Sequence, residues 1–242
     1  IVLDGDSMGE SVSNCLKSEY PEQAHQELSR KLINFSEAIA KHYKENVIYN
    51  GGDDVLALAP LSSAFQVAQN LAESFREITQ GITASAGIAI AHHLYPLGAT
   101  LQAARQAEQH AKQLDGKAAV CVQVLKRSGE ITRMRSSWLA VGSTLAEIVH
   151  LFKGDEQGQP LSARFAYDVG HSAYSLPEAD EKFEAELKRL IKRHRNSKHP
   201  LAPDSTKWAE RLRMWAASLP DQSTELGYWL ALARFMAQGG EG

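Results

Sequence analysis

The residues best suited to chemistry are the adjacent aspartates of the segment Gly51-Gly52-Asp53-Asp54. Short apolar runs flank this segment, which predicts a β-hairpin with the glycines in its turn. Glycine takes positive φ without steric cost, so a tight turn can present both carboxylates at the hairpin tip. Carboxylates in this position are suited to holding a divalent metal ion. A plain hairpin with solvated aspartates has the same pattern, and this alternative stays open.

Two further carboxylates, Asp4 and Asp6, follow the apolar run 1–3 at the start of the chain. This run predicts a buried strand, and a helix is expected to begin near Ser7 with Asp6 or Ser7 as its N-cap. The sequence leaves open whether Asp6 caps the helix or binds a metal ion. A carboxylate at the end of a buried strand costs free energy unless a cation or hydrogen-bond donors meet it, which makes Asp4 a candidate metal ligand.

The elements that must position these residues follow from apolar periodicity. Helical spacing predicts helices over about 7–45, interrupted near Pro21, then after Pro60, and over 97–114. Strands are predicted over 83–91 and 118–125. The order of the elements predicts an α+β fold, a ferredoxin-like βαββαβ palm with an antiparallel sheet covered by helices on one face.

In such a palm the first strand lies beside the hairpin, so Asp4 is expected to converge with Asp53 and Asp54. With the backbone carbonyl of Gly5 they form an all-oxygen site suited to Mg²⁺ or Mn²⁺ carrying a nucleoside triphosphate. Two such ions about 4 Å apart would activate a ribose hydroxyl and neutralise a pyrophosphate leaving group. Without a cation the crowded carboxylates would repel one another.

Composition limits the class of protein. The chain has 242 residues, 43% of them hydrophobic, and a formal net charge of −3, which argues against nucleic-acid binding through overall positive charge. Its only cysteines, Cys15 and Cys121, supply neither a zinc quartet nor a disulfide framework. We expect a cytoplasmic protein with no membrane partner, because there is no apolar run of spanning length and no signal peptide. The chain begins at Ile1 without an initiator methionine, and we expect a fragment of a larger protein.

From about Met134 onward the pattern becomes helical, which predicts a palm over 1–133 and an all-α C-terminal domain over 134–242. Predicted helices cover about 144–152, 161–175, 178–194, 205–219 and 224–238. The basic end of the helix 178–194 suits the helix dipole, and a contact with RNA or with a small helical subunit is the alternative. A second basic cluster is either a solvated edge or a contact with RNA or phosphate: Lys126, Arg127, Arg133 and Arg135.

Four segments resemble, in the same order, the large polymerase/cyclase-like subunit of type III-B (Cmr-type) CRISPR effector complexes. They are LDGDSMGE at 3–10, YNGGDDVLA at 49–57, ASAGIAIAHH at 84–93 and VLKRSG at 124–129. The resemblance implies a second palm that makes cyclic oligoadenylates from ATP when the assembled complex binds target RNA. It also implies that Asp4, Asp53 and Asp54 are metal ligands, with Asp53 and Asp54 catalytic.

The same resemblance implies partners: the other subunits of the effector complex, guide RNA and target RNA. Members of this family also carry a first palm, a zinc-binding region and often an HD nuclease domain, none of which is in this chain. We therefore expect the chain to be inactive by itself.

Residues that contact the nucleotide are also implied. The segment AEQHAK at 107–112 resembles a helix that supplies a phosphate-binding lysine, so Lys112 is a candidate for the triphosphate, with a solvated helix-end lysine as the alternative. Gly51 and Gly52 in the turn, and Ser85 on the strand 83–91, complete the candidate set. Small residues on that strand allow either a ligand or a packed helix to approach closely.

Diguanylate cyclases share this palm and a related hairpin. They use three side chains of the first helix to bind guanine and phosphate, but those places here hold Gly9, Val12 and Ser13. We therefore expect metal-dependent 3′–5′ adenylyl transfer. The alternatives are a non-catalytic scaffold that binds RNA and partner subunits, and a diguanylate-type cyclase.

Overall fold

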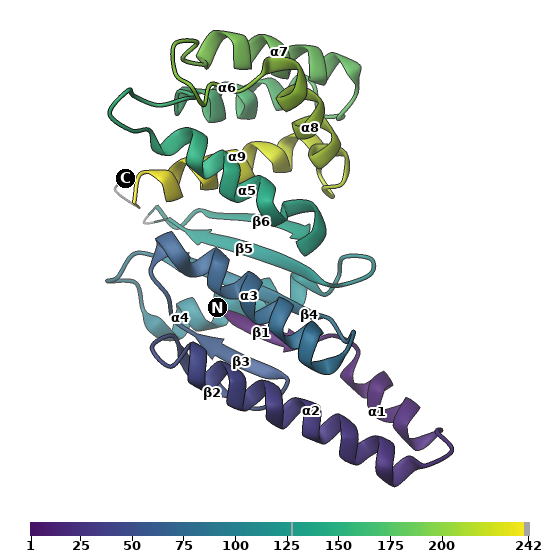
Figure 1. The fold of residues 1–242 in the computed structure, drawn as a ribbon. Coiled ribbons are helices and arrows are strands. Elements are labelled where there is room, and N and C mark those ends of the chain that lie inside the picture. The colour runs from purple at the N-terminus through teal and green to yellow at the C-terminus, as the bar shows by residue number, and fades with distance from the viewer. Residues whose placement is uncertain (127, 240–242) are drawn as a thin grey trace. The chain divides into compact units, whose positions relative to one another are not determined.

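The computed structural model describes residues 1–126 and 128–239. The chain divides into two compact units, Ile1–Arg133 and Met134–Gly242. Figure 1 labels the helices and strands of both.

The first unit is built on a sheet in which strands β2, β3, β1, β4 and β5 lie side by side in this order (Figure 1). Its elements in chain order are β1 (Val2–Gly5), α1 (Met8–Leu16), α2 (Pro21–His42), β2 (Val47–Asn50), β3 (Asp54–Ala57), α3 (Leu61–Thr79), β4 (Ala84–Ala91), α4 (Leu97–Ala111) and β5 (Ala119–Leu125). The first four strands pair in antiparallel fashion, as the predicted ferredoxin-like palm requires. Strand β5 extends the sheet by pairing in parallel with β4.

The predicted break in the first long helical segment is confirmed. Helix α1 ends at Leu16, and α2 begins with Pro21 in its first turn, where the missing N–H of proline costs no hydrogen bond. Helices α2 and α3 pack through the fully buried rings of Phe35 and Phe75, which meet edge to face with centroids 5.0 Å apart.

One face of the sheet packs against α3. Gly5 pairs with Ala84 across the β1–β4 ladder, and a Cβ on Gly5 would lie 2.9 Å from the Phe75 ring. Side chains alternate between faces along a strand, so Asp4 and its partner Ser85 lie on the opposite face.

Helix α4 covers that opposite face. Gly87, two residues beyond Ser85, has no room for a side chain, since a Cβ there would lie 2.1 Å from the backbone oxygen of Ala104. The prediction that helices cover only one face is therefore wrong. The parallel pairing of β4 and β5 requires a crossover connection, and a crossover helix must lie on a face of the sheet. Of the two alternatives for the small residues of β4, helix packing explains Gly87.

The sequence prediction also missed strand β6 (Ile131–Ser137), which runs across the boundary between the two units. Its burial alternates, with Met134 and Ser136 buried. Two residues of the predicted basic cluster, Arg133 and Arg135, lie on this strand, whereas Arg127 lies outside the described residues. With the Gln123 amide turned to accept, Arg133 donates two hydrogen bonds to it, at 3.0 and 3.2 Å, so Arg133 is not a free basic group.

The second unit is helical, as predicted, from α5 onward. It consists of α5 (Trp138–Lys153), α6 (Arg164–Ala173), α7 (Glu181–His194), α8 (Ser205–Ala217) and α9 (Gln222–Ala237). Non-helical dihedrals at Gly142 interrupt α5. Trp215 and Trp229 are buried in the core of this unit, with ring centroids 5.8 Å apart. Asp180 and Asp204 are the N-caps of α7 and α8, and their side chains accept hydrogen bonds from backbone N–H groups in the first turn of each helix.

Among the helices of the described residues, none combines the length and the apolar character needed to cross a membrane.

Candidate nucleotide and metal site

The β2–β3 hairpin forms where the glycines predict it. The backbone N–H of Gly51 donates to the backbone oxygen of Asp54 at 2.8 Å, and Gly52 has a φ of 101°, which favours glycine. The side chain of Asn50 donates to the backbone oxygen of Ser36 on α2 at 2.9 Å. The hairpin is thereby tied to a helix, with Asp53 half-buried and Asp54 exposed at its tip.

Strand β1 runs directly beside this hairpin. Asp4 is the register partner of Asp54, and the N–H of Gly5 donates to the backbone oxygen of Asp53 at 3.1 Å. Residues opposite each other in an antiparallel ladder direct their side chains to the same face. The structure therefore places Asp4 and Asp54 on one face of the sheet, across fifty positions of sequence.

Lys112 follows α4 on this same face. Its ammonium forms an ion pair with Asp4 Oδ2, donates to the backbone oxygen of Gly5 at 3.5 Å and lies 3.1 Å from Glu108 Oε1. The alternative of a solvated helix-end lysine is therefore wrong. Lys112 contacts two of the groups predicted to bind a metal ion, so the Asp4 carboxylate and the Gly5 carbonyl together accommodate a positive charge.

The donor set suits a hard divalent ion, because it consists of oxygen atoms only. Among the described residues, however, no three His, Cys, Asp or Glu side chains lie close enough together to form a metal site. Asp4 is neutralised by Lys112 instead, and Asp54 is exposed. The strands supply the predicted ligands in register, but the carboxylates do not converge as closely as the sequence predicts.

Asp6 does not cap α1, and its carboxylate accepts hydrogen bonds from other parts of the palm. It is 4% exposed, and its carboxylate accepts hydrogen bonds from Thr83 Oγ1 at 2.7 Å, Ser85 Oγ at 2.8 Å and the backbone N–H of Ala118 at 3.0 Å. The N-cap of α1 is Ser7, without a side-chain capping bond. Asp6 joins β1 to two later segments, and its oxygens are committed to these three donors.

Ser85 is fully buried and belongs to the same hydrogen-bond network. Its hydroxyl donates to Asp6 and accepts from the backbone N–H of Ala119 at 3.3 Å. The prediction that Ser85 contacts the nucleotide is therefore not supported, because its hydroxyl is already satisfied and closed off from solvent.

Glu108 is the site residue that sequence reasoning missed. It lies on α4 one turn before Lys112, is 9% exposed, and has its pKa raised to about 7 by burial and by the charges of Asp54 and Asp6. The only signal in the sequence was a glutamate on what became the buried face of α4. It could be recognised only after the structure showed which face of the helix is buried.

The pKa values of two groups in the site are shifted by burial and by neighbouring like charges. Burial and the neighbouring Asp53 raise the pKa of Asp54, although Arg105 acts in the opposite direction. Burial and Lys117 lower the pKa of Lys112. Groups whose pKa values are perturbed together in this way are characteristic of functional sites.

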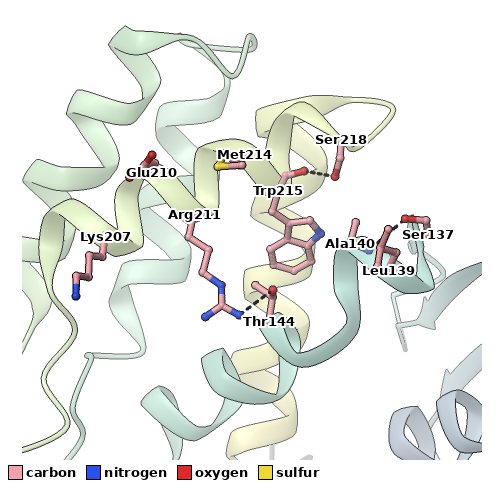
Figure 2. Close-up of a pocket in the computed structure, with 10 residues that line it drawn as sticks. All are labelled: Ser137, Leu139, Ala140, Thr144, Lys207, Glu210, Arg211, Met214, Trp215 and Ser218. Atoms are coloured by element: carbon pink, nitrogen blue, oxygen red, sulfur yellow. Dashed lines mark hydrogen bonds between the residues drawn. The ribbon is translucent and has the colours of Figure 1, made fainter.

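The helical unit contains a separate open groove between α5 and α8, with a volume of about 580 Å³. Figure 2 shows the Trp215 ring and the Arg211 side chain in it, with Arg211 donating to Thr144 Oγ1 at 3.1 Å. The groove is lined by Ser137, Leu139, Ala140, Thr144, Lys207, Glu210, Arg211, Met214, Trp215 and Ser218. None of the site residues predicted from the sequence is among them, so the candidate site remains in the first unit.

Comparison with known proteins identifies this unit. The family described as Cas10/Cmr2, second palm domain, matches residues 1–121. The CRISPR system Cmr subunit Cmr2 of Pyrococcus furiosus is 30% identical over 232 residues, covering 79% of this chain and 26% of that protein.

A second relative is the CRISPR system single-strand-specific deoxyribonuclease Cas10/Csm1 (subtype III-A) of Mycobacterium tuberculosis. It is 34% identical over 84 residues, covering 34% of this chain and 10% of that protein. The chain thus spans about a quarter of the first relative and a tenth of the second. With the palm topology and the hairpin in place, these matches show that the chain belongs to the Cas10/Cmr2 family and carries its second palm domain.

Proposed function

We propose that this chain is the nucleotidyl-transfer part of a type III CRISPR effector large subunit, and that it makes cyclic oligoadenylates from ATP when the assembled complex binds target RNA. The observation that carries the proposal is the register of β1 and β3, which sets Asp4 opposite Asp54 with a cationic side chain already held at Asp4. Family membership supports the effector role.

In this proposal Asp4, Asp54 and the carbonyl of Gly5 hold Mg²⁺ or Mn²⁺, with Asp53 beside them. The bound ion supplies charge neutralisation at the triphosphate and a lower pKa for the attacking ribose hydroxyl. The glycine turn at 51–52 carries no side chains, which allows a phosphate group to approach the backbone. Lys112 turns from Asp4 to the phosphates of ATP.

The reaction itself is an in-line displacement. The 3′ oxygen of one ATP forms a bond to the α-phosphorus of another, the bond from that phosphorus to the pyrophosphate oxygen breaks, and the hydroxyl proton is released. Repetition followed by ring closure gives the cyclic product. The chain's contribution is to orient the triphosphate and to stabilise the charge that develops on it.

The alternative function is a non-catalytic scaffold that positions RNA and partner subunits. One observation favours it: the ion pair between Lys112 and Asp4 neutralises the site without a metal ion. In both cases the proposed partners are the other effector subunits, guide RNA and target RNA in the cytoplasm.

The test is product formation by the reconstituted effector complex with cognate target RNA, ATP and Mg²⁺ or Mn²⁺. We expect the variant Asp53→Asn/Asp54→Asn to lose oligoadenylate formation while still assembling. Asp115→Asn, which changes an exposed carboxylate of the same unit, is the matched control. Unchanged product from the double variant would support the scaffold. Product from GTP alone but none from ATP would indicate a diguanylate-type cyclase.

A further inference from the structure

Glu108 is the exceptional residue on the buried face of α4. The other buried residues of this helix are all small and apolar: Ala103, Ala104, Ala107 and Ala111. A carboxylate in such a face costs free energy unless a counter-charge or a hydrogen-bond donor meets it. Here burial and two neighbouring carboxylates both disfavour its charged form, so packing alone does not explain a glutamate at this position.

The contacts of Glu108 lead to Lys112. Glu108 Oε1 lies 3.1 Å from the Lys112 ammonium, and the two side chains are only 11% and 26% exposed. Yet no group among the described residues donates a hydrogen bond to Oε1. Lys112 is directed instead to Asp4 and to the Gly5 carbonyl. Glu108 is a buried acceptor beside a cation that is engaged elsewhere.

This arrangement changes once a metal ion occupies the Asp4 carboxylate. Two cations close to one carboxylate repel each other, so the ammonium must leave Asp4. Glu108 is then the adjacent anion with a free acceptor oxygen. The two residues are one helical turn apart, with the glutamate on the N-terminal side, which is the favourable order for an ion pair on a helix.

We propose that Glu108 is a positioning residue that retains Lys112 beside the nucleotide phosphates when a metal ion takes its place on Asp4. The proposal rests on the proposed function, since it concerns the same site. The Lys112 ammonium therefore has two positions. Without metal it contacts Asp4 and Gly5, and with metal it contacts Glu108 and the phosphates. Without Glu108, the ammonium stays on Asp4 and competes with the metal ion, or turns into solvent.

The experiment is a double-mutant cycle on the assembled complex, read out as binding. The affinity for a non-hydrolysable ATP analogue with Mn²⁺ is measured for Glu108→Gln, Lys112→Met and the double variant. We expect each single variant to weaken binding by about 10-fold, the scale typical of residues that orient a primary ligand. The double variant should bind no more weakly than Lys112→Met, because Glu108 acts through the lysine. Losses that multiply would overturn the proposal.

Mn²⁺ alone provides a second readout. Lys112→Met should bind Mn²⁺ more tightly than the unaltered complex, because it removes the cation that occupies Asp4, whereas Glu108→Gln should bind it more weakly. A purely structural role of Glu108 would not produce this opposite pair. Glu77→Gln, an exposed glutamate on α3, is the control for charge removal. Equal Mn²⁺ affinity in all variants would contradict the proposal that the Lys112 ammonium has two positions.

These readouts separate the present proposal from the proposed function. If the complex binds the analogue with the expected coupling but forms no oligoadenylate, adenylyl transfer fails and the role of Glu108 stands. If product forms and Glu108→Gln leaves both the analogue affinity and the KM for ATP unchanged, the role of Glu108 fails alone. A complex that binds no nucleotide would overturn both.

Discussion

Two acidic side chains of the palm and four of the helical unit have pKa values shifted in opposite directions. In the palm, burial and neighbouring carboxylates raise the pKa values of Asp54 and Glu108. In the helical unit, four carboxyl groups have lowered pKa values and dedicated partners: Asp155, Asp168, Glu186 and Asp204. For Asp204 the main cause is the N–H of Lys207, which it accepts as the cap of α8.

The exception in the helical unit shows what separates the two groups. Burial raises the pKa of Glu225, although the backbone N–H groups of Arg135 and Asp221 act against it. The Glu225 carboxylate thus accepts hydrogen bonds from two backbone N–H groups and stabilises the backbone at both places. The palm carboxylates Asp54 and Glu108 are crowded by like charges instead. Carboxylates that are buried and crowded by like charges are typical of a binding site, whereas carboxylates with fixed donors are typical of stabilising contacts.

The largest expected effect is the loss of activity from Asp4→Asn. This change keeps the shape of the side chain but removes the charge that binds a cation beside Gly5, so product formation in the reconstituted complex should fall by roughly 100-fold or more. The thermal unfolding temperature should change little, because the ion pair with Lys112 is partly exposed. The measurement is oligoadenylate yield per assembled complex, beside Asp115→Asn. Full activity of Asp4→Asn would remove Asp4 from the proposed ligands. It would also weaken the contrast between functional carboxylates in the palm and structural ones in the helical unit.

The second expected effect is a loss of stability without loss of activity in the helical unit. Asp180 accepts from the backbone N–H groups of Lys182 and Phe183 at 3.0 and 2.9 Å, so Asp180→Ala should lower the free energy of unfolding by about 1 kcal/mol. Urea unfolding of the chain measures the change. Glu178→Ala, an exposed position just before the helix, is the control. A loss of product at unchanged stability would show that this unit takes part in the chemistry.

The smallest expected effect concerns pH and Glu108. Its pKa is about 7 in the folded chain against an ordinary value of 4.5, so the folded state binds the proton more tightly than the unfolded state. Stability should therefore fall as pH rises from 4.5 to about 7, and Glu108→Gln, which cannot ionise, should lack this fall. Unfolding temperatures at pH 5 and pH 8 in the presence of a chelator measure the difference. An equal pH dependence of the unfolding temperature in both proteins would show that groups other than Glu108 cause the loss of stability.

Local sequence patterns were sufficient for most of the first unit. The apolar periodicity around Phe65 and Phe75, the proline at position 21 and the glycine pair at 51–52 act within a few residues, and they predicted α3, the helix break and the hairpin correctly. Strand β6 was missed because Arg133 and Arg135 interrupt its apolar pattern, so the segment has the composition of a loop. The position of α4 on the opposite face of the sheet was missed, although the helix itself was predicted. This position depends on the parallel pairing of β5 with β4, which local sequence patterns do not determine.

The sequence by itself determined the residue types of the site: carboxylates after a buried strand and at a glycine turn, in an order that indicates a palm. Only the tertiary structure decided which of these carboxylates is available. It commits Asp6 to donors from Thr83, Ser85 and Ala118, and it pairs Asp4 with Lys112. These partners lie 77 to 112 positions away from Asp6 in the chain, and the pattern of neighbouring residues carries no information at that range. The cost of a buried charge depends on the groups that surround it in space, so the roles of Glu108 and Lys112 could be assigned only after α4 was placed on the sheet.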